Sequence, residues 1–432
     1  MRLAVFALLA CLGLAAQPLT FAQPLDLDTL GAQAFRAGSP LTAMAAWRDR
    51  YLKAGSPLNR FLHRQEILSA FASERFPNMD TLDSSAWVGL SSGPVTLNVP
   101  ATGSRYVTIQ FISAWAETFA IVSRNELEGR ATSLYLTPPG WSGATPPGYR
   151  RVACPTSIVA IWLRLFVAGE GDVSSVRSLQ RLFVFSGAPE PKPVPSTFLE
   201  ALGALLPANP PPPALRPTFQ RLAPIGLSLD RGFDPTMLDA ESRRALDAAI
   251  ALSRKDIPRL TRQQRRVGAG WVVFGSGPAI PGTLEERIAR ANTGPEAFAA
   301  LPDTELAYAV GYADSSGAPL QGDRRYVITL DPDDLPPVDG FWSFTVYTAS
   351  GRTVFGARNS IHSSTPYLNK TANGSIRITL GPSLPLAEQY NWLPLEPGEG
   401  ARVVLRLYQP RRAVFDGSWR PPAIVPAEQA GP

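Results

Sequence analysis

Histidine and cysteine are almost absent from this chain of 432 residues, which contains two of each. Histidine is the usual general base at neutral pH and the commonest metal ligand. A catalytic or zinc site built from several histidines is therefore excluded, and neither an HExxH nor a paired CxxC motif occurs. We expect no metal centre and no cofactor.

Lysine is also scarce, since it supplies only four of the 41 basic residues. The formal net charge is +5, and the arginines are spread thinly apart from a short cluster at Arg262–Arg266. Nucleic-acid binding would need a basic stripe together with aromatic or helical elements that read the bases. The sequence predicts no nucleic-acid partner.

Long apolar runs are missing after the N-terminus. There, Arg2 precedes the apolar run Leu3–Ala16, and Thr20–Ala22 resembles a signal-peptidase site. The run is shorter than the about 20 apolar residues that span a bilayer. Residues 1–22 are thus predicted to be a cleavable signal peptide, and the mature chain is predicted to be periplasmic or secreted and not transmembrane.

A second interpretation of the N-terminus stays open, because Leu8–Cys11 resembles a lipobox and Cys11 could carry a lipid anchor. Cleavage after Ala22 would instead remove Cys11 and leave Cys154 as the one remaining thiol. No intramolecular disulfide could then form, although an oxidising compartment would permit one. Apolar cores must therefore stabilise the mature chain.

Hydrophobic periodicity divides the chain into helical and β regions. Apolar residues recur at helix spacing around Trp47, and Phe61–Phe71 forms a second amphipathic set, so residues 23–75 are predicted to be a helical lead. Short runs rich in Val, Ile, Thr and aromatics, separated by turns, then predict an antiparallel β domain at residues 76–186. Its runs are Val95–Val99, Tyr106–Ile112, Phe119–Val122 and Ser157–Leu163.

A connector at residues 187–300 is predicted to separate this domain from a second one. Its prolines, dense at 187–214, indicate a semi-rigid spacer or surface loop, and a helix is expected after them. Residues 301–420 are predicted to be the second β domain, and residues 421–432 a frayed tail. Its runs are Tyr308–Tyr312, Tyr326–Leu330, Phe341–Tyr347, Ser375–Leu380 and Arg402–Tyr408. The predicted fold is mainly β: two antiparallel β-sandwich, jelly-roll-like domains with a helical lead and a helical connector.

Two groups of motifs resemble known families. The first group comprises Asn78–Trp87, Gly93-Pro94 and Tyr106–Trp115. The second comprises Leu335–Val338, Phe341–Ser343, Asn391–Pro394 and Arg406–Tyr408. The first resembles the family called domain of unknown function 1254, and the second resembles its usual C-terminal partner, domain of unknown function 1214. The resemblance implies two linked β-sandwich domains in an exported bacterial protein, and it implies no particular activity.

Several positions depart from the usual pattern of these families. The chain has Asp83 where the first family usually has tyrosine, and Asn359 and His362 where the second usually has tyrosine and glycine. Either the specificity of a shared site has changed, or an activity has been lost.

Short polar side chains gather just before the first predicted strand. They are Asn78, Asp80, Thr81, Asp83 and Ser84. Asp80 and Asp83 could act as general acid and base or bind a hard cation such as calcium, and Glu117 would join them if adjacent strands bring it near. The competing interpretation is that Asn78 and Asp80 cap turns by accepting hydrogen bonds from backbone N–H groups.

Nine tryptophans are spread through the chain, most of them in the β regions. Aromatic residues there usually fill a sandwich core, but they could also line a cleft that holds a glycan or an apolar ligand. The further ligand-binding candidates are Trp115, Arg358, His362, Asn391 and Trp392. His362 is expected in a polar loop, whereas His63 is expected on the surface of the early helix.

One literal catalytic motif occurs, because Gly89–Gly93 matches the G-x-S-x-G pattern of nucleophile elbows. Such an elbow needs a helix after the serine, but Val95–Val99 is predicted to be a strand. Ser91 is therefore expected in a hairpin turn between antiparallel strands.

Three functional hypotheses remain. The chain is an exported envelope protein that binds a small molecule or glycan at an aromatic and polar cleft, or a hydrolase-like enzyme that uses Asp80, Asp83 or Glu117, with or without a metal. A purely structural role is the third. The scarcity of histidine and the lack of a complete catalytic set favour binding.

Overall fold

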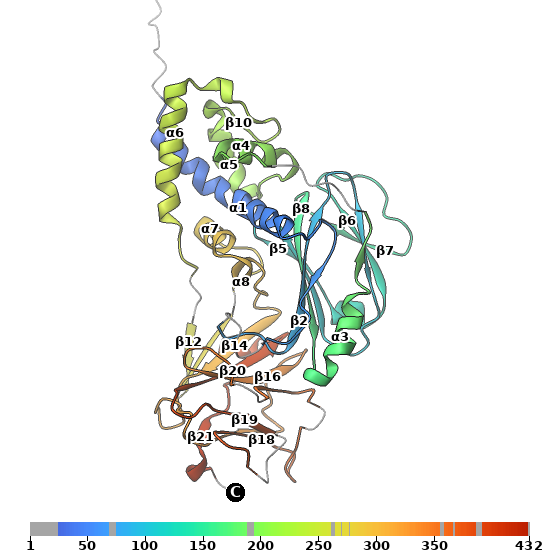
Figure 1. Cartoon of the computed structure of the whole chain (residues 1–432), viewed down its shortest axis with the longest axis vertical. Helices are drawn as coiled ribbons and strands as arrows, with labels where there is room; N and C mark the ends of the chain where they lie inside the picture. Colours follow the sequence, from blue (N-terminus) through green and yellow to red (C-terminus); the bar gives the residue numbers. More distant parts are fainter. Residues whose placement is uncertain are drawn as a thin grey trace, which may run out of the picture.

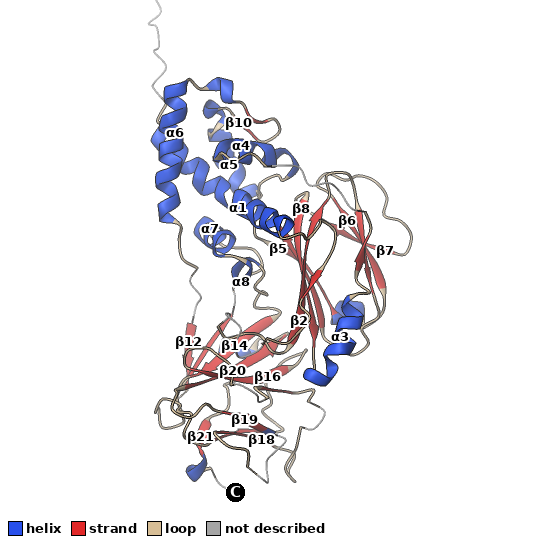
Figure 2. Cartoon of the chain, viewed as in Figure 1, coloured by secondary structure: helices blue, strands red, loops and turns tan. Residues whose placement is uncertain are grey.

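The computed structural model describes residues 25–68, 75–187, 194–260, 264–268, 270–275, 277–354, 358–365, 368–385 and 391–430. The predicted signal peptide, residues 1–22, lies outside them. Strands make up 29% and helices 28% of the described residues. Figure 2 shows the strands gathered in two β domains and most helices at one end of the molecule. The predicted mainly β fold with two sandwich-like domains is confirmed, and the described strand pairs are antiparallel except for two parallel ones.

The first β domain packs two sheets face to face. Its strands are β1 (Leu62–His63), β2 (Thr81–Gly89), β3 (Val95–Val99), β4 (Val107–Ser113), β5 (Thr118–Ser123), β6 (Thr132–Thr137), β7 (Tyr149–Ala153), β8 (Ile158–Phe166) and β9 (Val184–Phe185). One sheet has the order β1–β2–β8–β4–β5 and the other β7–β6–β3–β9. Alternate apolar residues of both sheets, such as Leu82 and Leu134, meet between them and form the core. The short helices of this domain are α2 (Arg124–Leu127) and α3 (Val173–Gln180).

The second β domain repeats this architecture with its own core. Its strands are β12 (Gln264–Val267), β13 (Trp271–Gly275), β14 (Leu306–Gly311), β15 (Tyr326–Leu330), β16 (Trp342–Thr348), β17 (Ser360–His362), β18 (Ile376–Gly381), β19 (Trp392–Pro394), β20 (Ala401–Tyr408) and β21 (Ile424–Pro426). One sheet has the order β12–β13–β14–β20–β16–β17, the other β19–β18–β15–β21. Phe344 and Ile378 lie in the core between them. The short helix α9 (Ala413–Asp416) follows β20.

The remaining helices form a layer that covers one end of the first β domain (Figure 1). They are α1 (Leu27–Lys53), α4 (Phe198–Leu205), α5 (Arg216–Arg221), α6 (Ala240–Ser253), α7 (Leu284–Thr293) and α8 (Pro295–Phe298). The two-stranded ladder of β10 (Leu227–Ser228) and β11 (Gly232–Phe233) accompanies them. One apolar core joins this layer to the sheet, since Phe198 and Leu246 cluster with Trp87 and Ala160.

Helix α1 is the centre of this layer. Asp26 caps its start by accepting a hydrogen bond from the Thr29 N–H at 3.0 Å. Gly31 lets α6 approach closely, because a Cβ at that position would lie 2.7 Å from the Cβ of Ala249. The predicted helical lead is therefore correct for residues 27–53.

The second helical set predicted at Phe61–Phe71 is wrong for the part that the structure describes. Leu62 and His63 form β1 and pair with Ser85 and Ser84 of β2. Without β1, the outer side of β2 would be an edge with unpaired backbone groups, and this pairing overrides the amphipathic pattern. His63 is consequently half-buried on a strand, not exposed on a helix.

The connector and tail also differ from their predictions. Strands β12 and β13, inside the predicted connector, belong to the six-stranded sheet. Helix α4 forms inside the proline-dense stretch because Leu199 and Leu202 are buried in the helical core. The predicted frayed tail contains β21, which pairs with β15 and buries Ile424 completely.

The turn at Ser91 links strands of different sheets, so the predicted hairpin is wrong. Strand β2 ends at Gly89 in one sheet and β3 begins at Val95 in the other. Ser91 is exposed in the turn between them, which Gly93 completes with a φ of 124°. Among the helices of the described ranges, none is long and apolar enough to cross a bilayer.

Candidate functional site

The outer face of the six-stranded sheet is buried against the first β domain, although such a face often meets solvent. Side chains alternate along β16 and β20, so the cross-strand partners Ser343 and Arg406 both point away from the sandwich core. Their exposed fractions are 0% and 3%. Figure 1 shows the end of the first β domain meeting this sheet near β16 and β20. The interface between the two domains is therefore polar and buried.

Asp80 lies at the centre of this interface. It is 1% exposed and accepts three hydroxyl hydrogen bonds across it: from Ser343 at 2.5 Å, from Ser360 at 3.0 Å and from Tyr408 at 3.0 Å. Burial raises the pKa of Tyr408, and the Asp80 carboxylate adds to this effect, so the hydroxyl keeps its proton. These bonds offset the cost of burying the Asp80 carboxylate.

Arg406 continues the network beside Asp80. Its Nη1 donates to Thr345 Oγ1 at 3.0 Å, and its Nη2 donates to the Tyr347 hydroxyl at 2.8 Å and to the Pro77 carbonyl at 3.2 Å. The Tyr347 hydroxyl also donates to the Pro77 carbonyl, at 2.5 Å. The chain segment that precedes β2 is thus fixed to the second β domain by side-chain bonds to its backbone.

The other polar residues of this segment form a chain of hydrogen bonds. Asn78 Oδ1 accepts from the Asp80 N–H at 2.8 Å, which is the geometry of a turn cap. Asn78 Nδ2 donates to Thr81 Oγ1 at 3.1 Å, and Thr81 donates to Asp83 Oδ1 at 2.8 Å. Ser84 lies apart from this chain and contacts His63 Nδ1 at 2.8 Å.

The three candidate carboxylates do not share a site. Asp83 accepts from Trp162 Nε1 at 3.3 Å, and its contacts differ from those of Asp80. Glu117 forms an ion pair with Arg287 of α7 at 2.6 Å, so the expected approach of Glu117 to the aspartates does not occur. The pairing of β4 with β5 turns Glu117 towards the helical layer.

Trp115, in the turn between β4 and β5, also packs into the core of the helical layer. Its ring is 1% exposed and packs edge-on against Phe219 of α5, with centroids 5.8 Å apart. Its Nε1 donates to the Asn209 carbonyl at 3.2 Å. The proline-rich segment that contains Asn209 therefore docks onto this tryptophan.

His362 lies beside the Asp80 network, on the strand that also carries Ser360. It is on strand β17, and not in a loop as predicted, because it pairs with Ser343 across the sheet. Its ring meets Phe166 edge-on at 4.7 Å, which joins the two domains. Burial lowers the pKa of His362 and the charge of Arg358 adds to this, while Asp80 opposes it.

Asn391 and Trp392 lie at the start of β19, in the four-stranded sheet of the second β domain, away from this interface. Asn391 Oδ1 accepts from the Asn369 N–H at 2.9 Å and its Nδ2 donates to the Asn369 carbonyl at 2.6 Å. These bonds fix the loop before β18. Trp392 is half-buried at the start of β19.

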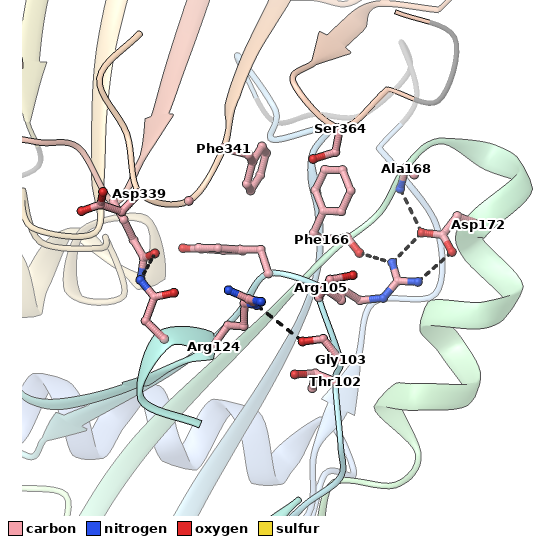
Figure 3. A pocket seen from close by; sticks show the side chains of 15 residues that line it. Thr102, Gly103, Arg105, Arg124, Phe166, Ala168, Asp172, Asp339, Phe341 and Ser364 are labelled. Atoms are coloured by element: carbon pink, nitrogen blue, oxygen red, sulfur yellow. Dashed lines mark hydrogen bonds and ion pairs between the residues drawn. The ribbon is translucent and has the colours of Figure 1, made fainter. Parts of the chain in front are cut away.

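A cleft of about 760 Å³ opens between the two β domains, beside this interface (Figure 3). Its apolar wall consists of Tyr106, Phe166, Ala168 and Phe341. Its polar lining includes Thr102, Arg105, Arg124, Asp172, Ser364 and Gln409. The wall belongs to an aromatic cluster that also contains Tyr408, whose ring stacks on Phe341 at 4.0 Å. The cleft and the Asp80 network thus share one aromatic layer.

Two of the charges that line the cleft neutralise each other. Arg105 donates to Asp172 with both terminal nitrogens, Nη1 to Oδ2 at 2.5 Å and Nη2 to Oδ1 at 2.9 Å. Burial by itself would raise the pKa of Asp172, but hydrogen bonds from Arg105 and from the Ala168 N–H hold it below its ordinary value. This pair fixes one rim of the cleft.

The opposite rim carries Asp339 and Arg124. Asp339 Oδ1 accepts from Arg411 Nε at 2.8 Å. Arg124 donates from Nε to the Gly103 carbonyl at 3.4 Å, and within the described ranges it has no carboxylate partner. The cleft therefore combines aromatic side chains with an arginine whose charge is not neutralised.

Two family models match the chain, one on each side of this cleft. Residues 58–186 match the model described as "Protein of unknown function (DUF1254)", and residues 305–412 match "Protein of unknown function (DUF1214)". The chain carries a DUF1254 domain followed by a DUF1214 domain. No curated protein matches the chain.

Two solved structures resemble the chain over most of its length. The VPA0106 protein from Vibrio parahaemolyticus has a TM-score of 0.69 and 19% identity, and the comparison covers 93% of this chain and 100% of that one. A putative uncharacterized protein from Burkholderia cenocepacia has a TM-score of 0.42 and 13% identity, and covers 92% and 93%. At this identity, the likeness to the Vibrio protein concerns the fold alone.

Each family domain supplies one half of the interface. Asp80 belongs to the DUF1254 domain, whereas Ser343, Arg406 and Tyr408 belong to the DUF1214 domain. Asp80 and Tyr408 are 328 residues apart in sequence, yet they are hydrogen-bonded. Every residue that lines the cleft also falls inside one of the two matched segments.

Prediction from the sequence missed most of the cleft. Arg105, Arg124 and Asp172 are ordinary charged residues in the strand and loop pattern of the DUF1254 domain. The motif segment at Phe341 stood out, but as a β strand. No local signal marks these positions, because the cleft forms only where two distant parts of the chain pack together.

Glu305 is a titratable residue that lies behind the lining residue Gln409 of the cleft. Burial raises the pKa of Glu305 to about 7, although a hydrogen bond from Gln409 Nε2, at 3.4 Å, partly offsets this. Gln409 in turn accepts a hydrogen bond from Asn125 of the DUF1254 domain at 2.9 Å. The folded chain therefore holds the Glu305 proton more tightly than the unfolded chain does. This contribution to stability is complete below pH 4.5 and is lost as the pH rises through 7.

Replacing Glu305 with glutamine is expected to stabilise the chain at pH 8, by about 1–3 kcal/mol, and to have little effect at pH 4. Urea unfolding as a function of pH measures this. The exposed Glu296→Gln is the control, for which no such pH dependence is expected. An unchanged pH profile for Glu305→Gln would show that the carboxyl is not held in its protonated form.

Proposed function

We propose that this chain is an exported protein that binds a small molecule in the cleft between its DUF1254 and DUF1214 domains. The observation that carries the proposal is the cleft itself, with its volume of about 760 Å³ and its aromatic wall beside hydrogen-bond donors. Small-molecule sites are usually concave, have volumes of about 300–1,000 Å³ and combine an apolar lining with a few placed polar groups. The cleft meets each of these criteria.

A small molecule is favoured over a glycan as the ligand. Phe166 and Phe341 are 8% and 4% exposed, and their rings meet edge-to-face at 4.7 Å. Sugar rings stack on open aromatic faces, whereas these two rings pack against each other and leave little of either ring exposed. They suit a compact apolar group that enters between them and the polar rim.

Export is supported by the N-terminal sequence, in which Arg2 precedes Leu3–Ala16 and a small-residue cleavage site ends at Ala22. The remaining Cys154 is 3% exposed, and burial raises its pKa to about 12. Such a thiol is unreactive in an oxidising compartment. Finding Gln23 as the first residue of the mature protein would support export, whereas a lipidated Cys11 would indicate an anchored protein.

The hydrolase alternative has less support. The Asp80 carboxylate is occupied by three hydroxyl donors, and Glu117 is occupied by Arg287. Across the residues that the structure describes, no three His, Cys, Asp or Glu side chains gather as a metal ion would require. A general base needs a free oxygen within reach of substrate; both oxygens of Asp80 are buried and hydrogen-bonded, and Glu117 is held in an ion pair.

Filling the cleft should abolish binding without unfolding the protein. Ser364 lines the cleft and is exposed, so Ser364→Trp is expected to leave the melting temperature of the free protein nearly unchanged. Differential scanning fluorimetry with small carboxylates, phosphate esters, amides and sugars should reveal ligands that stabilise the wild-type protein. A ligand at a concentration 100 times its Kd raises the free energy of unfolding by about 2.7 kcal/mol.

The matched control is Ser92→Trp, which adds the same side chain at an exposed turn outside the cleft. Ligand stabilisation is expected to persist in this control and to vanish in Ser364→Trp. Equal stabilisation of both variants would place the ligand elsewhere and refute the proposal.

A further inference from the structure

We infer that the ligand of this cleft is a small organic anion whose charged group binds Arg124. The inference rests on the proposed function, since it names the chemical class of the ligand for that same site. It depends on the hydrogen bonds of Arg124, on the pairing of the other charges and on one orphaned hydroxyl.

Arg124 has more N–H donors than it uses in hydrogen bonds within the described part of the chain. A guanidinium carries five N–H donors, and Arg124 uses Nε for the Gly103 carbonyl at 3.4 Å. Within the part of the chain that the structure describes, its terminal nitrogens have no acceptor. Figure 3 shows this side chain within the cleft, between Asp339 and Arg105. By contrast, Arg130, a few residues further along the chain, is paired with Glu128 outside the cleft.

Of the four charged side chains that line the cleft, Arg124 is the one without an ion-pair partner among the described residues. Arg105 and Asp172 form one pair, and Asp339 is paired with Arg411. One positive charge therefore remains on a half-buried side chain. An anionic ligand that reached this guanidinium would supply the counter-ion that the described residues do not provide.

Thr102 offers a further polar contact at the same rim. It lines the cleft and is 8% exposed, and its Oγ1 has no hydrogen-bond partner among the described residues. Buried hydroxyls are normally paired, so an acceptor on the ligand would complete this one. Thr102 precedes Gly103, whose carbonyl orients Arg124.

The apolar wall indicates what the rest of the ligand is like. Phe166 and Phe341 border the cleft together with Ala168, beside the polar rim. A carboxylate or phosphate group would accept two parallel hydrogen bonds from the planar guanidinium. A compact apolar body would then contact the two phenylalanines.

Matched probes test this class directly. Benzoate and phenyl phosphate carry the charge, and benzamide has nearly the shape of benzoate without it. Isothermal titration calorimetry on the full chain should show benzoate binding about tenfold or more tightly than benzamide. The phenyl phosphate arm distinguishes a preference for phosphate from one for carboxylate.

Arg124→Gln should weaken benzoate binding about tenfold or more and change benzamide binding less than about twofold. Arg124→Lys should recover part of the loss, because it restores the charge but not the paired donors. Arg130→Gln is the matched control, and it should bind all three probes like the wild-type protein.

Equal binding of benzoate and benzamide, both abolished by Ser364→Trp, would overturn the anion inference and leave the proposed function intact. Anion binding that survives Ser364→Trp would overturn both. If neither benzoate nor phenyl phosphate binds at millimolar concentration while benzamide or a sugar does, the anion inference also fails.

Discussion

Replacing Asp80 with alanine is expected to lower the free energy of unfolding by about 3–5 kcal/mol, as found when one partner of a buried charged network is removed. Ser343, Ser360 and Tyr408 would lose their acceptor, and the buried charge of Arg406 would lose its nearby carboxylate. All five groups lie between the two family domains. The loss of stability should therefore include loosened contact between the domains.

Urea or thermal unfolding of Asp80→Ala measures this effect. Asp334→Ala, at an exposed position of the DUF1214 domain, is the control and should stay within about 0.5 kcal/mol of the wild-type protein. Asp80→Asn should lower the free energy of unfolding less than Asp80→Ala does, because asparagine keeps the shape and one acceptor oxygen. A normal melting temperature for Asp80→Asn combined with loss of turnover of some substrate would instead support the catalytic interpretation of Asp80.

Trp115→Ala is expected to destabilise the chain by about 3–5 kcal/mol, the usual cost of emptying a buried tryptophan site. The ring lies between the five-stranded sheet and α5, and its Nε1 fixes the proline-rich segment at Asn209. Trp115→Phe keeps most of the packing and removes the hydrogen bond, so it should lower the free energy of unfolding by about 1 kcal/mol.

Chemical denaturation of both Trp115 variants separates structure from ligand binding. Trp141→Ala is the control. Trp141 is half-buried in a loop of the DUF1254 domain, so its replacement should lower the free energy of unfolding less than Trp115→Ala does. If Trp115→Ala folded with normal stability but lost its response to ligands, Trp115 would belong to a binding site and the structural assignment would be wrong.

The long strands could be predicted because their pattern is local. Val95–Val99 and Tyr326–Leu330 match β3 and β15 residue for residue. In β3, apolar and polar side chains alternate between buried and more exposed positions. Each such strand carries its own alternation, which a single sequence shows directly.

The short strands could not be predicted, because their partners determine them. Strands β1 and β21 contain two and three residues, too few to show a period. They form because β2 and β15 each have an open side that needs backbone hydrogen bonds. The formation of α4 inside the proline-dense stretch likewise depends on a distant partner, because Leu202 of α4 packs against α1 at Gly38.

The candidate site was predictable only in part. The polar segment at Asp80 stood out as a cluster, but nothing in the sequence shows that Tyr408 and Ser343 meet it. Even so, both lie in the motif segments of the DUF1214 domain, as Asp80 lies in that of the DUF1254 domain. The motifs therefore mark the contact between the domains and, through Tyr106 and Phe341, part of the aromatic wall of the cleft, but they include none of its charged residues.

The location of a bound anion decides whether the interdomain cleft is the ligand site. Co-crystals grown with 4-bromobenzoate allow the bromine atom to be placed by its anomalous scattering. We expect one bromine in the cleft, against Phe166 and Phe341, with the carboxylate at Arg124. Bromine found only at other surfaces of the protein would contradict the assignment of the interdomain cleft as the ligand site.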